Sequence, residues 1–252
     1  MKEFGDVYTF GTLDIDGKKF PKVLLGTSPF LGAGQFGAKS YVYYRQFYEN
    51  PKNITKIVVE CVKLGCNAVQ AICFPPVVIA IQDAVKATDT EIFIMGSTGL
   101  GAISNEIEQM KQLKAQSIVT HGSYTDRTLN RDPEKLRQTL QAIKDEIAGI
   151  ASHTPGTIVE KAALMEEVKL MLVPFNKIGL FMDPSFELTV QAAESARRVG
   201  KKIIAMKSLA AGKLEPAVAF QFLQDRVDGV AVGLTSMEEI KETLKVARSY
   251  FG

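Results

Sequence analysis

The chain has 252 residues, 46% of them hydrophobic, and its 30 basic and 28 acidic residues give a formal net charge of +2. This composition indicates a globular protein and excludes a disordered one, and the length suits one barrel domain of ~250 residues. Because no basic stripe and no RRM, KH or zinc-finger signature occurs, we expect no nucleic-acid partner. The apolar runs are too short to span a bilayer and the start MKEFGDVYTF has no signal-peptide core, so we expect a cytoplasmic protein without a membrane partner.

Residues 1–21 are expected to contain a hairpin. The run VYTFGTLDIDGKKFPKV alternates around Asp16-Gly17, a dipeptide that favours a tight turn between antiparallel strands. Beyond it, short apolar runs alternate with amphipathic stretches, which is typical of a parallel sheet covered by helices. Eight such runs are predicted strands: 22–27, 67–73, 91–96, 117–121, 146–151, 170–175, 202–206 and 229–233.

A stretch with helical periodicity follows each predicted strand. Asp132-Pro133 and Asp183-Pro184 each place a capping acid before a proline suited to the first helical position. Ser236, followed three residues later by Glu239, fits a capping box. Eight βα units predict a (β/α)8 TIM barrel as a single domain over residues 1–252. An open doubly wound sheet is the alternative, but no GxGxxG motif follows the first strand.

Residues 29–52 form the longest segment without helical or strand periodicity. The segment follows the first predicted strand, so we expect it to be a loop over the mouth of the barrel. Its run YVYYRQFY is rich in aromatic residues, which suits a loop that covers a pocket.

The chemistry of a TIM barrel lies at the carboxyl ends of its strands, and both histidines of the chain stand there. SIVTHG ends the fourth predicted strand with His121, and AGIASHTPG places His153 just beyond the fifth. Because no Asp or Glu stands at a predicted strand end, acid–base work would fall to these histidines, to Lys177 or to Lys207, which follows the seventh strand. A structural role for each histidine is the alternative.

The loops after the seventh and eighth predicted strands favour a bound phosphate. KSLAAGKL and GLTSMEEI are small and contain glycine, and the second leads into the N-terminus of a helix. Backbone N–H groups and the helix dipole attract anions there, and TIM barrels often hold a phosphate at this place. Ordinary tight loops with ordinary caps are the alternative.

The three cysteines, Cys61, Cys66 and Cys73, form no CxxC motif, and we expect reduced thiols. A zinc site usually needs three protein ligands. Two histidines and one strand-end cysteine, two strands away from the fourth, argue against such a site, so we expect no metal.

The order and spacing of several phrases resemble the aldo-keto reductases, a family of NADP-dependent TIM-barrel oxidoreductases. LLGTSPFLGAG resembles the family's first-strand glycine loop, CVKLGCNAVQA the entry to its second strand, SIVTHG its fourth strand and AGIASH its fifth. VPFN resembles its sixth strand, and IIAMKSLAAGKL and VAVGLTSMEEIKETL resemble its seventh and eighth, which hold the cofactor's phosphates in the family. The resemblance implies NADP as the cofactor.

The resemblance also implies a catalytic set of Asp, Tyr, Lys and His, of which only the His carries over, onto His121. Gln70 stands at the position of the Asp, Ser97 stands at that of the Lys, and the helix after the second strand offers no Tyr. The cofactor-binding residues that it implies are Asn176, Ser208, Gly212, Gly233, Thr235 and Ser236.

Three functions are compatible with these residues. The first is a divergent aldo-keto reductase-like, NADP-dependent oxidoreductase with an altered active site, in which a Tyr of YVYYRQFY replaces the missing acid. The second is a different barrel enzyme that acts on a phosphorylated or carbonyl substrate through His121, His153 and Lys207, with Lys207 as a Schiff-base nucleophile. The third is a non-catalytic barrel that binds a small molecule. The sequence leaves the substrate and the oligomeric state open.

Overall fold

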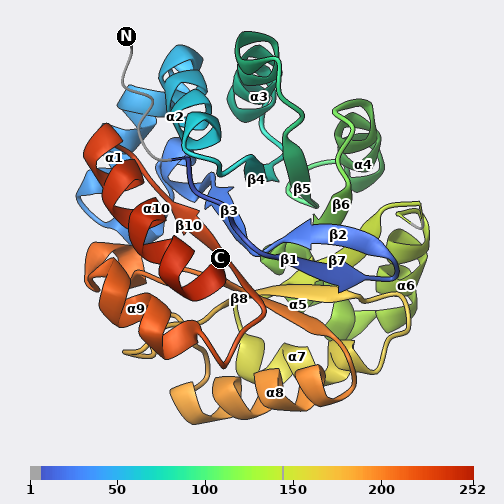
Figure 1. The fold of residues 1–252 in the computed structure, drawn as a ribbon. Coiled ribbons are helices and arrows are strands. Elements are labelled where there is room, and N and C mark those ends of the chain that lie inside the picture. The colour runs from blue at the N-terminus through green and yellow to red at the C-terminus, as the bar shows by residue number, and fades with distance from the viewer. Residues whose placement is uncertain (1–6, 144) are drawn as a thin grey trace, which may run out of the picture.

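The computed structural model describes residues 7–143 and 145–252, in which eight parallel strands close into a barrel (Figure 1). All eight predicted strands are confirmed, each displaced by two residues at most, and the TIM-barrel prediction is correct. Going around the barrel, β10 pairs with β3 and β9, and every other strand pairs with its neighbours in the sequence. The strands are β3 (Val23–Gly26), β4 (Ala68–Ile72), β5 (Phe93–Thr98), β6 (Ser117–Thr120), β7 (Ile147–Ala151), β8 (Leu170–Pro174), β9 (Lys202–Met206) and β10 (Gly229–Gly233).

The predicted hairpin closes the amino-terminal end of the barrel. Its strands are β1 (Thr12–Ile15) and β2 (Lys18–Pro21), and both turn residues, Asp16 and Gly17, have the positive φ that the expected turn requires. Phe20 of β2 is fully buried against Phe93, with ring centroids 5.1 Å apart. The side chain of Phe20 therefore closes the amino-terminal end of the barrel. Residues 1–6 of the predicted hairpin segment lie outside the described part of the chain.

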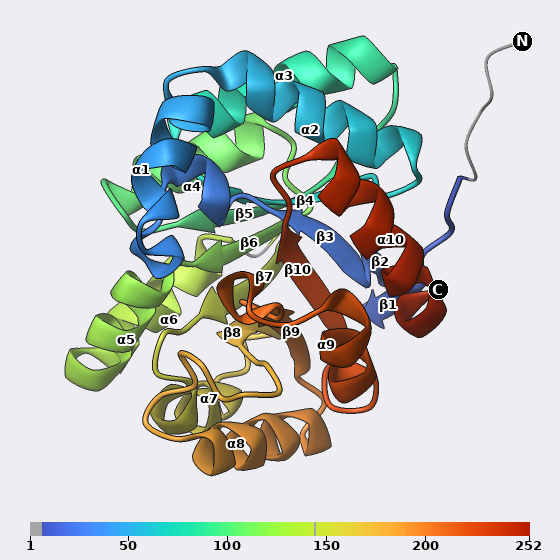
Figure 2. The same ribbon diagram turned by 90° about the vertical axis from the view of Figure 1, so that its left-hand side faces the viewer.

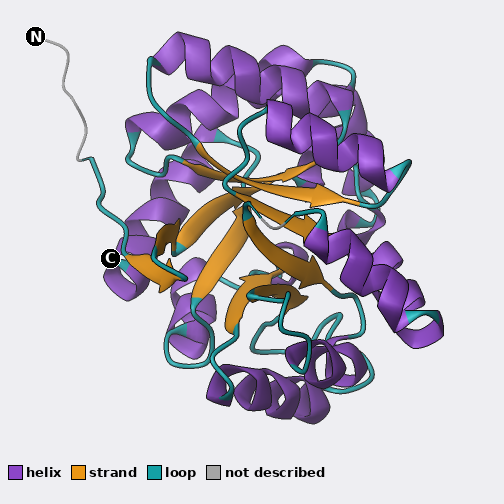
Figure 3. Cartoon of the chain, turned by 90° about the vertical axis from the view of Figure 1, so that its right-hand side faces the viewer, coloured by secondary structure: helices purple, strands orange, loops and turns teal. Residues whose placement is uncertain are grey.

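Helices surround the barrel, and the eight that the sequence predicted are all present (Figure 3). Their buried stripes pack on the strands because apolar residues recur at helical spacing. They are α2 (Pro51–Lys63), α3 (Pro75–Thr88), α4 (Ile103–Gln112), α6 (Pro133–Gln141), α7 (Pro155–Ala163), α8 (Phe186–Arg198), α9 (Pro216–Leu223) and α10 (Met237–Phe251). Within the described part of the chain, none of the helices is long and apolar enough to cross a membrane.

Two helical segments were not predicted. The first, α5 (Gly122–Arg131), buries mostly Tyr and Thr side chains, so its sequence lacks the apolar periodicity of a core helix. The second replaces the loop expected over residues 29–52 with short 3₁₀ turns, α1 (Lys39–Tyr43) and a π-helical turn over Tyr44–Tyr48. Phe47 of that turn is buried 5.0 Å from the ring of Phe30, and this contact anchors the segment to the core. Figure 2 shows the hairpin at one end of the barrel and α1 and α5 at the other, so the segment does lie at the mouth.

One of the predicted caps is wrong and two are correct. The bond Asp183-Pro184 is a cis peptide, and α8 begins two residues later with Ser185 as its cap, whose Oγ accepts a hydrogen bond from the N–H of Leu188 at 3.2 Å. Asp132 caps α6 as predicted, and Ser236 caps α10. The three cysteines are buried free thiols, as expected, and burial raises the pKa of Cys66 to about 12.

Candidate active site at the carboxyl end of the barrel

The two histidines meet at the ends of neighbouring strands. His121 follows β6 and His153 follows β7, and because β6 and β7 pair in parallel, the two imidazoles lie side by side with ring centroids 5.1 Å apart and planes at 79°. Gly122 makes this contact possible, because a Cβ atom there would lie 3.0 Å from the ring of His153. The backbone N–H of His153 donates a hydrogen bond to Oδ2 of Asp126 on α5 at 2.9 Å. This bond fixes His153 against α5, the helix that His121 caps.

His121 is a neutral imidazole with a defined tautomer. It caps α5, and its Nδ1 accepts a hydrogen bond from the backbone N–H of Ser123 at 3.2 Å. A backbone N–H can only donate, so the proton of the neutral ring must sit on Nε2. Burial, followed by the charges of His153 and Lys207, lowers the pKa of His121 to about 4. His121 therefore offers an Nε2–H donor near neutral pH, and a neutral imidazole of this kind can polarise a carbonyl group.

Lys207 stands at the same site, immediately after β9. Its backbone carbonyl accepts hydrogen bonds from Nδ2 of Asn176 at 3.3 Å and from the N–H of Ala210 at 2.9 Å. Its Nζ lies 4.5 Å from the ring centroid of Phe181. Burial lowers the pKa of Lys207, and Asp183 opposes this effect. The structure places the three residues predicted to be catalytic at the carboxyl ends of β6, β7 and β9, and the charge of Lys207 adds to burial in lowering the pKa of both histidines.

A cavity of about 240 Å³ opens beside Lys207, between the ends of β3, β9 and β10 and the segment that contains α1. Tyr43 of α1 lines it, so the aromatic run at the mouth does bring a tyrosine to the site. Gln70 lines it from β4 and is the residue aligned with the missing Asp. Ser208 is 1% exposed, and its Oγ has no hydrogen-bond partner among the described residues. A buried hydroxyl without a partner at a cavity wall marks a place where a ligand can bind.

Four of the six predicted cofactor residues line this cavity, namely Ser208, Gly212, Gly233 and Thr235. Ser236 is the next residue in the chain, at the cap of α10. Asn176 is not among the residues that line the cavity, and its buried side chain holds its own loop. Its Nδ2 donates to the carbonyl of Leu180 at 2.8 Å, and its Oδ1 accepts from the N–H of Leu180 at 3.0 Å.

At the start of α10, where a phosphate was predicted, the carboxylate of Glu239 accepts the available hydrogen bonds. Oε2 of Glu239 accepts hydrogen bonds from the N–H of Thr235 at 2.7 Å and from its Oγ1 at 2.8 Å. Glu215 and Glu242 also line the cavity, while Lys39 adds one cation on the side of α1. A phosphate at this place would lose hydrogen-bond donors to Glu239 and would face three carboxylates at the solvent-exposed rim.

Asp126 and Phe181 belong to the site but were not predicted. Asp126 lies on α5, which has no strong sequence signal, and Phe181 lies in the loop between β8 and α8. Neither residue directly follows a strand, so the rule that strand ends carry the site could not predict them. Among the described residues, no group of three His, Cys, Asp or Glu side chains is arranged to hold a metal ion.

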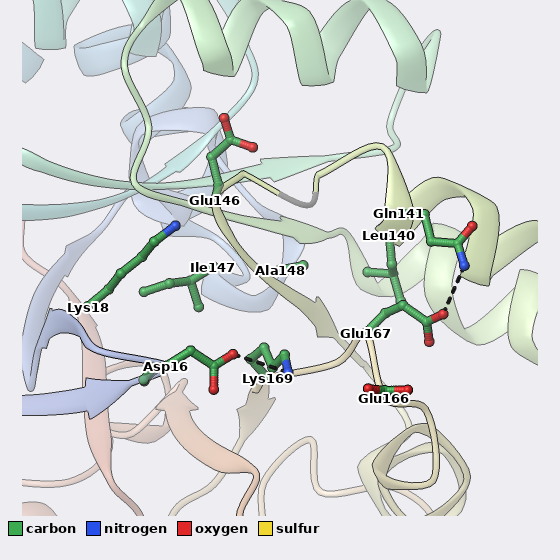
Figure 4. Close-up of a pocket in the computed structure, with 11 residues that line it drawn as sticks. Asp16, Lys18, Leu140, Gln141, Glu146, Ile147, Ala148, Glu166, Glu167 and Lys169 are labelled. Atoms are coloured by element: carbon green, nitrogen blue, oxygen red, sulfur yellow. Dashed lines mark hydrogen bonds and ion pairs between the residues drawn. The ribbon is translucent and has the colours of Figure 1, made fainter.

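A larger cavity of about 440 Å³ lies at the opposite end of the barrel, between the hairpin and the loops that enter β7 and β8 (Figure 4). Its walls carry mostly charged side chains, among them Lys18, Glu146 and Lys169, and Asp16 pairs with Lys169 at 3.1 Å. Barrel enzymes react at the carboxyl ends of their strands, where His121 and Lys207 stand. Lys207 lines the smaller cavity, whereas His121 and His153 stand at the same end of the barrel and are not among the residues that line it, so we place the candidate active site at this end.

Comparison with known proteins gives relatives in structure but not in sequence: no family model and no curated protein matches the chain. A Pseudomonas aeruginosa protein assigned to the aldo-keto reductases superposes with a TM-score of 0.72 at 16% identity, covering 100% of both chains. An aldo/keto reductase from Klebsiella pneumoniae, in complex with NADP and acetate, superposes with a TM-score of 0.61 at 12% identity, covering 96% of this chain and 90% of the other. Phosphoribosyl anthranilate isomerase from Thermus thermophilus superposes with a TM-score of 0.52 at 13% identity, covering 77% of this chain and 94% of the other. The resemblance in the sequence is thus confirmed for the fold, a TIM barrel like that of the aldo-keto reductases.

Proposed function

We propose that this protein acts on the carbonyl group of a small molecule bound at the carboxyl end of the barrel. The observation that carries the proposal is the neutral His121, whose Nδ1 is occupied by the N–H of Ser123 and whose Nε2–H is therefore a donor. A carbonyl oxygen accepts such a hydrogen bond, and the bond strengthens as negative charge develops on the oxygen during attack at the carbon. The ring of His153 lies 5.1 Å from that of His121, and Lys207 follows β9 at the same end of the barrel, so we assign the proton transfers that follow to these two residues.

An ordinary aldo-keto reductase mechanism is not available to these residues. Gln70 and Ser97 occupy the positions of the family's Asp and Lys, and both are buried side chains that do not ionise near neutral pH. Tyr43 reaches the cavity from α1 and is the residue in the best position to replace the missing acid. An NADP-dependent oxidoreductase with this altered site is the second candidate function, and the shared fold and Tyr43 favour it.

NADP(H) fits this cavity poorly. The unpartnered Oγ of Ser208 and the small residues Gly212 and Gly233 would suit a bound cofactor. However, Glu239 already occupies donors at the start of α10, and a cavity of about 240 Å³ is smaller than the ~300–1,000 Å³ of typical ligand sites. A Cβ atom on Gly233 would lie 2.6 Å from Pro29, so the segment after β3 packs closely over this wall.

Two measurements test the proposal. The first is a titration with NADPH and NADH, followed by the fluorescence of the reduced nicotinamide and by the melting temperature. We expect no change in either; saturable binding with stabilisation would favour the oxidoreductase.

The second measurement is calorimetric binding of glyceraldehyde and of glycerol, which lacks the carbonyl group, to the wild type and to His121→Asn. Asparagine keeps an acceptor for the N–H of Ser123 and removes the imidazole, so the variant should fold. We expect binding of glyceraldehyde to the wild type, weaker binding to the variant and none of glycerol. Equal affinity of both proteins for glyceraldehyde would show that His121 does not contact the carbonyl group, and would favour a barrel that only binds small molecules.

A further inference from the structure

We propose that Lys207 forms an imine with a small, uncharged, hydroxylated carbonyl compound. This inference rests on the proposed function, and it identifies the nucleophile and the class of substrate. Lys207 follows β9, at the end of the barrel where His121 and His153 also stand, and it lines the cavity there.

Burial and the lack of an ion pair favour a free amine at Lys207. Within the described part of the chain its Nζ forms no ion pair, while the ring of Phe181, with its centroid 4.5 Å from Nζ, favours the charged ammonium. Burial lowers the pKa of Lys207, with Asp183 as the opposing charge. A lysine that is largely removed from water and forms no ion pair loses its proton more readily, and the neutral amine is the form that attacks a carbonyl carbon.

The two histidines supply the proton transfers that imine formation needs. The Nζ lone pair would form a bond to the carbonyl carbon while the C=O π electrons move to the oxygen, which the Nε2–H of His121 holds. The nitrogen then passes a proton through the neutral His153 to that oxygen, which gives a carbinolamine. A second proton, taken from the medium, lets the C–O bond break, so that water leaves and a protonated imine remains. The neutral amine, the carbonyl compound and one proton thus give the protonated imine and one water, with no oxidant or reductant.

The cavity walls select an uncharged, hydroxylated compound. The buried Oγ of Ser208 has no partner among the described residues, and Gln70 and Thr235 add further polar groups that can bind hydroxyls. The carboxylates of Glu215, Glu239 and Glu242 line the same cavity and outnumber its two lysines, Lys39 and Lys207, which disfavours an anion. A short hydroxy-aldehyde or hydroxy-ketone fits these groups better than its phosphate ester.

The backbone that carries Lys207 is strained. Lys207, Ala210 and Ala211 have φ values of 55°, 49° and 56°, a left-handed conformation that side chains with a Cβ rarely adopt. Residues in such conformations persist where the surrounding structure holds them, and they cluster at functional sites. Here Nδ2 of Asn176 and the N–H of Ala210 donate hydrogen bonds to the carbonyl of Lys207. These bonds hold the strained backbone from which the amine extends.

Trapping with sodium cyanoborohydride tests the inference. The full-length protein is incubated with glyceraldehyde or dihydroxyacetone and the reductant, and the adduct is located by intact-mass and peptide mass spectrometry. Reduction of the imine adds the mass of the carbonyl compound less one oxygen atom. We expect one rapidly formed adduct on Lys207, absent from Lys207→Arg and Lys207→Gln and retained in Lys213→Arg, a matched change at an exposed lysine of the same loop.

The outcomes separate the inference from the proposed function. If calorimetry shows that glyceraldehyde binds the wild type but no adduct forms on Lys207, the imine is wrong and the carbonyl site stands. If glyceraldehyde neither binds nor reacts, both proposals are wrong. Faster labelling by glyceraldehyde 3-phosphate than by glyceraldehyde would overturn the assignment of an uncharged substrate. An unchanged melting temperature in the Lys207 variants confirms that a lost adduct reflects the lost amine.

Discussion

Acidification should destabilise this protein through His121. The folded state lowers the pKa of His121 to about 4, whereas an unfolded histidine titrates near 6.5. At a pH between these two pKa values, His121 is protonated in the unfolded chain and neutral in the folded chain. Stability is therefore complete above pH 6.5, falls as the pH drops below it, and stops falling on this account below about pH 4.

The expected magnitude follows from the separation of the two pKa values. Each pKa unit corresponds to about 1.4 kcal/mol, so the full effect is on the order of 3 kcal/mol, of which about 2.5 kcal/mol is lost by pH 4.5. The side chain is only partly exposed, so solvent screens the effect weakly. His153 acts in the same direction, because burial also lowers its pKa.

Urea unfolding between pH 7 and pH 4.5, followed by circular dichroism, measures this loss. His121→Asn keeps the cap of α5, and the chain has only two histidines, so the double variant with His153→Asn gives a histidine-free baseline. The wild type should lose about 2.5 kcal/mol more than His121→Asn over this range, since carboxylates titrate equally in both proteins. Parallel curves for the wild type and the two variants would refute a neutral, buried His121.

Three further substitutions test the geometry of the site. Asn176→Ala should reduce the free energy of unfolding by about 2–4 kcal/mol, because it leaves buried backbone groups of the β8–α8 loop without partners; a loss below 1 kcal/mol in urea unfolding would contradict this role. Gly122→Ala should weaken glyceraldehyde binding in calorimetry, since its Cβ would displace the neighbouring imidazole, while Gly34→Ala, which meets open space, should not; equal effects would show that the contact is unimportant. Glu239→Ala should bind inorganic phosphate more tightly than Glu242→Ala, because only the first change frees the N–H at the start of α10. Identical phosphate affinities would argue that Glu239 does not block an anion there.

The barrel was predictable because its signals are local and strong. Each strand is a short apolar run buried on both faces, and the turn at Asp16-Gly17 needs a conformation that few dipeptides favour. The helix α5 was missed because threonines form much of its buried face; Thr125, for example, hydrogen-bonds Thr120 at 2.8 Å inside the fold. A buried threonine that finds its partner on another element has no distinct signature in the sequence.

The site was predictable only in part, for a related reason. A strand end predicts a position at the mouth, which is why His121 and His153 could be placed together. Asp126 enters from a helix, so its contact depends on tertiary packing. The phosphate prediction and the capping-box prediction concerned the same end of α10. A bound phosphate and the carboxylate of Glu239 would compete for the same hydrogen-bond donors. In the structure the carboxylate of Glu239 accepts from the N–H and the Oγ1 of Thr235.

The central claim is that a carbonyl compound binds beside His121 and Lys207. Amide chemical-shift mapping of the ¹⁵N-labelled protein during titration with dihydroxyacetone tests it most directly. We expect saturable shifts at His121, Lys207 and Ser208, with the amides of Lys18 and Lys169 in the larger cavity unchanged. Shifts confined to that larger cavity, or no saturable shifts at all, would contradict it.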